Sequence, residues 1–333
     1  MTMTADQKLV ALFYETIGNK VNGQLIDVVD GPLVHNFIMK PSDKSNMTTI
    51  SKVARDNQYM VVYDDDNIII QIPKETRNTI LLQDLTNSKE FKDTDATLPL
   101  VMGVDTFGKI IIQDLRKMPH LLVSGRTGCG KSVFINCVLE SLKAKLSPSE
   151  CKFIIIDTKG VDFDRWDGEK HLMCPVVKLD IDEAFQKLQE VLQIMDGRYQ
   201  KLQDNKVTNV EEYRKKTNKT DMPYIIVAID EFADLICTDK KQTETFVKAI
   251  ANRARAVGIH LIMATQRLDK DILTSTLKAN MPSRIAFQAR NKADSIQMID
   301  ESGAECLTSY ADMLYSDAGR LPVRIHTPFI EGM

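Results

Sequence analysis

The segment from Gly125 to Ser132 reads GRTGCGKS and matches the phosphate-binding pattern G-x-x-x-x-G-K-[ST] at every fixed position. It follows an apolar run at 120–123 and precedes a helix-compatible stretch at 133–145. Glycines let backbone N–H groups curl around phosphates, and the next helix points its positive end at them. We therefore predict a site for ATP in which Lys131 contacts the β- and γ-phosphates and Ser132 ligates Mg²⁺. The other nucleotide-binding residues predicted here are Gly125, Arg126, Thr127, Gly128, Cys129, Gly130 and Val133.

A second apolar run, at 224–229, ends in the adjacent carboxylates Asp230 and Glu231. Unbroken apolar runs of this length are typical of central strands in a parallel sheet that is covered on both faces. Ligands of such sheets bind at the carboxyl ends of the strands. We expect Asp230 to hold Mg²⁺ and Glu231 to polarise the attacking water. A glutamate in this place favours an ATP-hydrolysing motor, because GTPases commonly position water with a glutamine.

Two further apolar runs complete the predicted sheet. Residues 153–156 end in the polar segment 157–160, and residues 259–264 end in Thr265, Gln266 and Arg267. Gln266 follows a strand that would lie beside the strand of Asp230, so it is a candidate sensor of the γ-phosphate. Simple capping of a loop is an equally good interpretation of Gln266. Four strands that end in polar residues at one edge predict an α/β fold with a RecA-like P-loop NTPase core.

Several longer segments are shared with one group of motors. They include 118–123 before the phosphate loop, 230–235, 253–261, 264–267, 278–287 and 311–315. With these segments the chain resembles the motor of the FtsK/SpoIIIE DNA translocases, in the FtsK–HerA branch of RecA-like ATPases. The similarity is strong from about Pro119 to Phe329 and weaker from about Gly31 to Lys117. It implies ATP hydrolysis coupled to movement along double-stranded DNA by a homo-oligomeric ring, with a hexamer expected.

The length of 333 residues suits two domains. We predict a smaller α+β domain at 1–95, which the resemblance places in a second tier of the ring, and the ATPase motor domain at 96–333. The smaller domain is expected to contain helices at 9–17 and 44–56, strands at 33–39, 60–62 and 68–72, and an acidic hairpin turn at 63–67. Residues 89–97 are predicted to connect the domains, and 204–221 to form a surface excursion.

Composition limits the classes of function. A net charge of −3 excludes a chain that coats nucleic acid with its whole surface, but not a ring that touches DNA through pore loops. No apolar stretch reaches the roughly twenty residues needed to span a bilayer. Six scattered cysteines without zinc spacing indicate a reduced, cytoplasmic protein. Cys129, beside Lys131 in the phosphate loop, is a candidate for a lowered pKa and a redox role, although a tolerated small residue explains it better.

Basic residues after residue 264 are the candidates for DNA contact. The resemblance implies that loops after Gln266 and around Lys292 face the central channel, and we select Arg267, Lys278 and Lys292 as phosphate contacts. Solvated surface side chains are an equally good interpretation of each. Because Phe287 is the only aromatic residue at 268–299, tracking along a duplex is favoured over base stacking.

A ring ATPase also needs a group supplied across the subunit boundary. An arginine at a neighbour's γ-phosphate stabilises charge in the transition state. Arg255, at the end of a helical stretch, is the first candidate for this catalytic role, and Arg284 and Arg198 follow it. Interaction of Arg255 with the helix dipole is the alternative interpretation.

We expect this chain to lack the membrane anchor and the C-terminal winged-helix module of the FtsK/SpoIIIE family. Membrane attachment or loading would therefore need a separate partner. Two other functions stay open at this point. One is the same motor working as a coupling or packaging ATPase of a mobile element. The other is a protein-secretion ATPase resembling those of type VII systems, although such proteins usually carry several motor cassettes in one chain.

Overall fold

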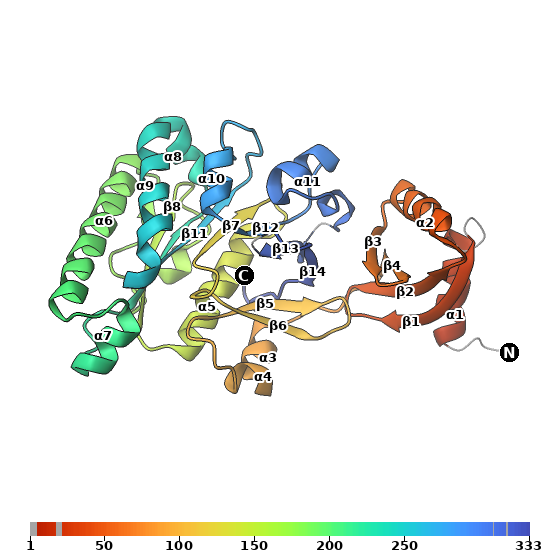
Figure 1. The fold of residues 1–333 in the computed structure, drawn as a ribbon, viewed down its shortest axis with the longest axis horizontal. Helices are drawn as coiled ribbons and strands as arrows, with labels where there is room; N and C mark the ends of the chain where they lie inside the picture. Colours follow the sequence, from red (N-terminus) through yellow and green to blue (C-terminus); the bar gives the residue numbers. More distant parts are fainter. Residues whose placement is uncertain (1–4, 18–21, 309, 318) are drawn as a thin grey trace.

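The computed structural model describes residues 5–17, 22–308, 310–317 and 319–333. Figure 1 shows an elongated molecule, with a large sheet and its helices on the left and a smaller N-terminal sheet on the right. The parallel-rich sheet with its covering helices confirms the predicted α/β fold class. No helix in the described part of the chain is long and apolar enough to cross a membrane.

The large sheet has ten strands among the described residues, in the order β6-β5-β14-β13-β12-β7-β11-β10-β8-β9. Its parallel part consists of β12 (Ser283–Ala286), β7 (His120–Ser124), β11 (Ile259–Thr265), β10 (Tyr224–Ile229), β8 (Cys151–Asp157) and β9 (Val177–Lys178). Antiparallel strands extend it: β13 (Asp312–Asp317), β14 (Val323–His326), β5 (Pro99–Asp105) and β6 (Ile110–Asp114). The four motor strands predicted from the sequence are the adjacent strands β7, β11, β10 and β8.

Helices cover both faces of the parallel part. The cluster on one face includes α6 (Ile181–Asp204), α8 (Phe232–Thr238) and α9 (Lys240–Arg253), and the other face packs against α5 (Lys131–Lys145). Successive residues of β10 belong to opposite clusters: Ile225 packs with α6, α8 and α9, and Ile226 packs on the face of α5. Both faces of the strand are therefore buried, which explains its unbroken apolar sequence. The remaining helices of the larger unit are α3 (Leu82–Asn87), α4 (Lys89–Lys92), α7 (Val210–Thr217), α10 (Ser275–Asn280) and α11 (Lys292–Ile299).

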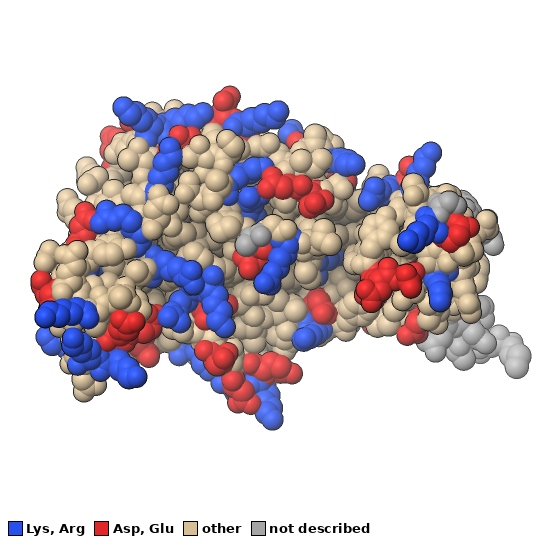
Figure 2. Space-filling view, viewed as in Figure 1, with Lys and Arg blue, Asp and Glu red and all other residues tan. Residues whose placement is uncertain are grey.

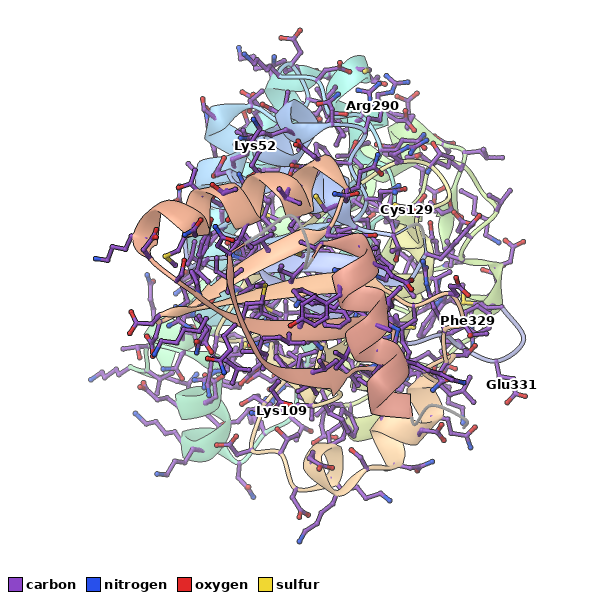
Figure 3. The ribbon with its side chains drawn as sticks, turned by 90° about the vertical axis from the view of Figure 1, so that its right-hand side faces the viewer. Lys52, Lys109, Cys129, Arg290, Phe329 and Glu331 are labelled. Carbon is purple, nitrogen blue, oxygen red and sulfur yellow. The ribbon has the colours of Figure 1, made fainter. Side chains whose placement is uncertain are left out.

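The N-terminal sheet is antiparallel, in the order β1 (Gly23–Asp30), β2 (Val34–Pro41), β4 (Asn67–Pro73) and β3 (Met60–Asp64). Helices α1 (Ala5–Thr16) and α2 (Lys44–Asp56) cover one face, which is turned toward the viewer in Figure 3. Phe13 of α1 and Ile50 of α2 share a core with Phe37 and Ile70 from the strands. These side chains alternate with residues of the opposite face, as expected for strands with two different surroundings.

The opposite face of the N-terminal sheet joins the large sheet through buried polar side chains. Asn36 Nδ2 donates to the carbonyl of Thr106 at 2.7 Å, and Gln71 Oε1 accepts from Arg324 Nη1 at 3.2 Å. Arg324 also donates to both carboxylate oxygens of Asp312, at 3.0 and 2.6 Å. Burial opposes ionisation of Asp312, but the Arg324 charge still holds its pKa well below the usual range. The network satisfies polar groups that would be costly to bury alone.

The structure contains three elements that were not predicted from the sequence. Strand β1 was not predicted, residues 89–97 contain α4, and the excursion at 204–221 contains α7. Helix α7 is short and mostly polar, so an apolar periodicity could not reveal it. Its start is instead stabilised by the N-cap residue Asn209, whose side chain accepts a hydrogen bond from Glu212 N. The predicted helix at 44–56 matches α2, and the acidic hairpin turn lies between β3 and β4. Helices α3 and α4 precede residue 95 in the chain but pack with β5 and α5, which follow it. The domain boundary at residue 95 therefore stays a prediction.

Candidate nucleotide-binding site

The phosphate loop joins the end of β7 to the start of α5. Its glycines Gly125, Gly128 and Gly130 have φ values of +156°, +75° and +104°. A Cβ atom on Gly125 would lie 2.6 Å from Phe287 Cβ and 2.9 Å from Cys129 Sγ, so only glycine fits there. The loop therefore takes a path that L-residues with side chains would resist, immediately before a helix N-terminus.

A cavity of about 480 Å³ opens beside the loop. It is lined by most of the predicted nucleotide-binding residues, namely Thr127, Gly128, Gly130, Lys131, Ser132 and Val133. Four further residues complete the lining: Lys159, Asp162, Gln266 and Tyr310. Of the remaining predicted residues, Gly125 and Cys129 lie behind the loop next to Phe287, and Arg126 is exposed. A cavity that combines a helix N-terminus, two lysines and the carboxylate of Asp162 suits a polyphosphate with its cation.

Lys131 is buried at the centre of the loop. Its Nζ donates to the carbonyl oxygens of Gly125 and Arg126 at 2.9 and 2.8 Å. Burial lowers the pKa of Lys131. Burial also raises the pKa of the Cys129 thiol and outweighs the nearby Lys131 charge, which contradicts the expected lowering of that pKa. Cys129 is therefore a packed thiol that donates to the Arg126 carbonyl at 2.8 Å.

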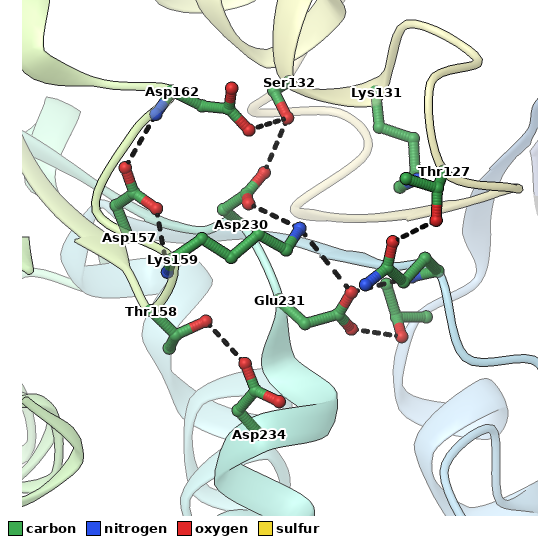
Figure 4. Close-up of polar contacts among 12 residues, drawn as sticks. Thr127, Lys131, Ser132, Asp157, Thr158, Lys159, Asp162, Asp230, Glu231 and Asp234 are labelled. Carbon is green, nitrogen blue, oxygen red and sulfur yellow. Dashed lines mark hydrogen bonds and ion pairs between the residues drawn. The ribbon is translucent and has the colours of Figure 1, made fainter. Parts of the chain in front are cut away.

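Ser132 and the first carboxylate after β10 lie together at the cavity. Ser132 Oγ donates to Asp230 Oδ1 at 3.0 Å and to Asp162 Oδ2 at 2.8 Å (Figure 4). Burial raises the pKa of Asp230. In the described part of the chain, no three His, Cys, Asp or Glu side chains form a metal site by themselves. Mg²⁺ usually binds through one or two carboxylates plus substrate phosphates, so the donors Ser132, Asp230 and Asp162 fit a cation that arrives with a nucleotide.

Glu231 is fixed between β10 and β11. Its side chain is 1% exposed and accepts from Thr265 Oγ1 at 2.6 Å and from Gln266 N at 3.0 Å. Burial raises the pKa of Glu231. The Gln266 side chain reaches the phosphate loop, where its Oε1 accepts from Thr127 Oγ1 at 2.5 Å. Gln266 thus contacts both the predicted base and the predicted phosphate site, as a sensor would need to.

Sequence reasoning missed Lys159 and Asp162. Lys159 Nζ lies 3.1 Å from Asp230 Oδ2 and 3.8 Å from Glu231 Oε2, between the two carboxylates (Figure 4). Both missed residues follow β8, which pairs in parallel with β10 from Tyr224 onward. The polar end of β8 was the available signal. Only the strand order, which the sequence does not reveal, brings that end to the acidic pair.

The three predicted DNA contacts differ in their surroundings. Arg267 is half-exposed, with Nη1 3.1 Å from Cys237 Sγ and Nη2 3.9 Å from Asp234 Oδ1. Lys278 is mostly buried, forms an ion pair with Asp300 and donates to a carbonyl of α11. Lys292 is exposed at the first turn of α11. Figure 2 shows basic and acidic side chains interspersed on one face of the molecule, with Lys and Arg gathered near α7.

The arginine candidates also separate. Arg255 is exposed in a short 3₁₀ turn (Ala254–Val257) before β11. Arg198 is buried and donates to the carbonyls of Val257 and Pro223, each at 2.7 Å. Arg284 donates to the Met281 carbonyl at 3.1 Å and forms an ion pair with Asp300. Arg198 and Arg284 are thus held by their own chain, which leaves Arg255 as the exposed candidate of the three.

A model of the FtsK/SpoIIIE family matches residues 81–270, which contain the phosphate loop, the acidic pair and Gln266. The chain belongs to the FtsK/SpoIIIE family. It is 38% identical to DNA translocase FtsK of Haemophilus influenzae over 347 residues and 35% identical to that of Pseudomonas aeruginosa over 365 residues. These alignments cover 93% and 99% of this chain but 65% and 45% of those relatives. The chain thus spans about half the length of these curated relatives.

Solved structures agree on the fold. The pCW3 conjugation coupling protein TcpA, solved as a monomer with ATPγS, matches with a TM-score of 0.67 at 22% identity, over 96% of this chain and 94% of TcpA. The cytoplasmic domain of the type VII secretion ATPase EccC from Thermomonospora curvata matches with a TM-score of 0.65 at 23% identity. That match covers 71% of this chain and 29% of the EccC chain. At these identities the likeness establishes a shared P-loop ATPase fold.

Proposed function

We propose that this chain is an ATP-driven translocase of double-stranded DNA that works as a homo-oligomeric, hexameric ring in DNA segregation or transfer. The observation that carries the proposal is the similarity to relatives named DNA translocase FtsK along 93–99% of this chain. The similar region includes a phosphate loop that lines one cavity and an acidic pair whose first member, Asp230, accepts a hydrogen bond from Ser132 of that loop. The six cysteines are free, which is typical of proteins in a reducing compartment, so we propose a cytoplasmic location for the translocase.

In the proposed reaction, ATP is the substrate and the loop Gly125–Ser132 holds its phosphates. Lys131 and the N-terminus of α5 provide positive charge for the β- and γ-phosphates. Ser132 and Asp230 would hold Mg²⁺, which neutralises charge on the phosphates when bound. Glu231, fixed by its two hydrogen bonds, orients and polarises the attacking water. The burial that raises the Glu231 pKa also makes this carboxylate a better proton acceptor.

Coupling to DNA needs a connection from the nucleotide to the channel loops. Gln266 touches the phosphate loop through Thr127, and Arg267 follows it directly in the chain. A second connection runs through Asp234 on α8, whose Oδ2 accepts from Thr158 Oγ1 at 2.8 Å and whose Oδ1 lies 3.9 Å from Arg267 Nη2. Loss of the γ-phosphate would change the contacts of Gln266 and so shift the Arg267 segment relative to the DNA.

We assign the contacts with DNA phosphates to Arg267, Lys278 and Lys292. Arg267 and Lys292 have the exposure that such contacts need. Lys278 must first leave Asp300, so its contribution depends on rearrangement between α10 and α11. Arg255 is proposed to act at the γ-phosphate of a neighbouring subunit.

The first experiment measures steady-state ATP hydrolysis by the chain with linear duplex DNA, with single-stranded DNA and without DNA. We expect strong stimulation by the duplex alone. Glu231→Ala should reduce the stimulated rate by roughly a hundredfold or more, because the residue that positions water is lost. This variant should still bind nucleotide, since Glu231 does not form the phosphate loop. Hydrolysis that is indifferent to every DNA would contradict the proposal.

The same assay tests the alternatives. A coupling or packaging ATPase of a mobile element would also respond to duplex DNA, so its client must be sought in cells through the DNA that the protein crosslinks. A secretion ATPase resembling the type VII systems would ignore DNA and respond to a peptide substrate. Stimulation by peptide and not by duplex would therefore replace the proposed function with the secretion role.

A further inference from the structure

Lys159 is the one basic side chain of the cavity that the proposed reaction leaves without a role. Its ammonium group lies 3.1 Å from Asp230 and 3.8 Å from Glu231, two carboxylates whose side chains are at most 1% exposed. Two adjacent buried carboxylates without a counter-charge would be unfavourable. Burial alone would lower the pKa of Lys159, but the charge of Asp230 and its hydrogen bond more than compensate and raise it.

The backbone that carries Lys159 is fixed, whereas its side chain has room to move. Asp157, at the end of β8, accepts from the N–H groups of Lys159 and Gly160 at 3.1 and 2.9 Å, and from that of Asp162 at 3.0 Å. Thr158 is tied to Asp234 of α8. The Lys159 side chain, by contrast, is 32% exposed and lines the cavity. A rotation of this side chain can thus remove the ammonium group from Asp230 without unfolding the turn.

Lys159 and a metal ion would draw on the charge of the same carboxylate. Asp230 is the carboxylate proposed to hold Mg²⁺, and its Oδ2 atom is the partner of Lys159 while its Oδ1 atom accepts from Ser132. An ammonium group on one oxygen weakens the attraction of the carboxylate for a divalent cation on the other oxygen, because the two positive charges repel each other. Binding of metal-loaded nucleotide at Asp230 is therefore favoured when Lys159 moves away.

We propose that Lys159 is an internal counter-cation that shares the Asp230 carboxylate with the Mg²⁺ site and is displaced when metal-loaded nucleotide binds. This inference rests on the proposed nucleotide site and deepens it. Lys159 balances the negative charge of Asp230 and Glu231 before loading. It also affects how much Mg²⁺ is needed for loading, since its ammonium group opposes a second cation at the same carboxylate. Lys159 is thus a positioning residue whose effect appears in metal affinity.

The test measures binding of Mn²⁺ by electron paramagnetic resonance at saturating ADP, with the Mg²⁺ requirement for binding of a fluorescent ADP analogue as the second readout. Lys159→Gln keeps a polar side chain and removes the charge, whereas Lys159→Arg keeps the charge. We expect the half-saturating metal concentration of Lys159→Gln to fall by about tenfold, because an ion pair of this separation is lost as a competitor. Lys159→Arg should stay within about twofold of the wild type.

Lys178→Gln is the matched control. Lys178 also pairs with two carboxylates, those of Asp164 and Asp167, but it lies outside the cavity. An unchanged or weaker metal affinity in Lys159→Gln, with circular dichroism showing a folded protein, would overturn the inference and leave Lys159 a structural residue. If Lys159→Gln does not fold, tighter metal binding by Lys159→Met supports the inference and weaker binding overturns it. Failure of the wild type to bind ADP at saturating Mg²⁺ would overturn the proposed function and this inference together.

Discussion

At the scale of single residues, Gly125 has the tightest surroundings of the phosphate-loop glycines. A Cβ atom there would meet Phe287 and Cys129 at less than 3 Å, whereas nothing lies within 4 Å of a Cβ atom on Gly128. Phe287 is fully buried and packs edge-on against Phe134 of α5, so it cannot move aside without disturbing the helix that follows the loop. The loop path and the core behind it are therefore linked at Gly125.

We predict that Gly125→Ala weakens nucleotide binding by roughly 5- to 150-fold, which corresponds to about 1–3 kcal/mol of backbone strain at one site. Titration of a fluorescent ADP analogue into the variant measures this change. Gly168→Ala is the control, because Gly168 has a φ of +79°, has nothing within 4 Å of its Cβ position, and lies outside the cavity. Equal affinity of Gly125→Ala and the wild type would show that the loop tolerates a side chain there.

The same residues show how far sequence reasoning reaches. Lys131, Ser132, Asp230 and Glu231 could be predicted because each belongs to a local pattern whose chemistry is fixed by spacing along the chain. Lys159 could not, because its proposed role arises from the pairing of β8 with β10, which brings it to Asp230, 71 residues away in the chain. Local patterns identify the ends of strands, but only the order of strands in the sheet decides which ends meet.

At the scale of elements, two histidines join the starts of the central strands β7 and β11. The Leu261 N–H donates to His120 Nδ1 at 3.2 Å, and His260 Nδ1 lies 3.0 Å from the carbonyl of Pro119. Both rings are buried, and neither Nε2 atom has a hydrogen-bond partner among the described residues. Burial lowers the pKa of His120 to about 3 and that of His260 to about 4. Both imidazoles are therefore neutral in the folded protein at neutral pH.

We predict that these histidines make the free energy of unfolding fall as the pH drops from about 6.5 toward 4. In that window the unfolded chain binds protons that the folded chain cannot, so acid favours unfolding. Urea unfolding at pH 7.5, 6.5, 5.5 and 4.5 measures the effect. The double variant His120→Gln/His260→Gln should lose less stability than the wild type across this range, whatever its stability at pH 7.5. Parallel curves for the two proteins would contradict the prediction.

At the scale of the whole molecule, strand direction separates two groups of functional residues. The phosphate loop, Asp230 and Gln266 all follow the carboxyl ends of parallel strands, whereas Arg255 precedes the amino end of β11. The seven residues of β11 therefore place Arg255 roughly 20 Å from the nucleotide cavity of its own chain. An exposed arginine at that distance can act in hydrolysis only if a second subunit presents it to a neighbour's cavity.

Mixing of two inactive variants tests this arrangement. We expect Arg255→Ala to lower the rate of DNA-stimulated hydrolysis by about a hundredfold or more while leaving nucleotide affinity unchanged, because an arginine from a neighbour acts on the transition state. Glu231→Ala is inactive for a different reason, since it lacks the water-positioning carboxylate but keeps Arg255. Random assembly of both variants into a head-to-tail ring restores an intact pair at about a quarter of the interfaces. A hydrolysis rate of the mixture above that of either variant alone would therefore place Arg255 at a neighbouring site. Labelled subunits must first confirm that the two variants share rings. In that case, a mixture as inactive as either variant would exclude this role.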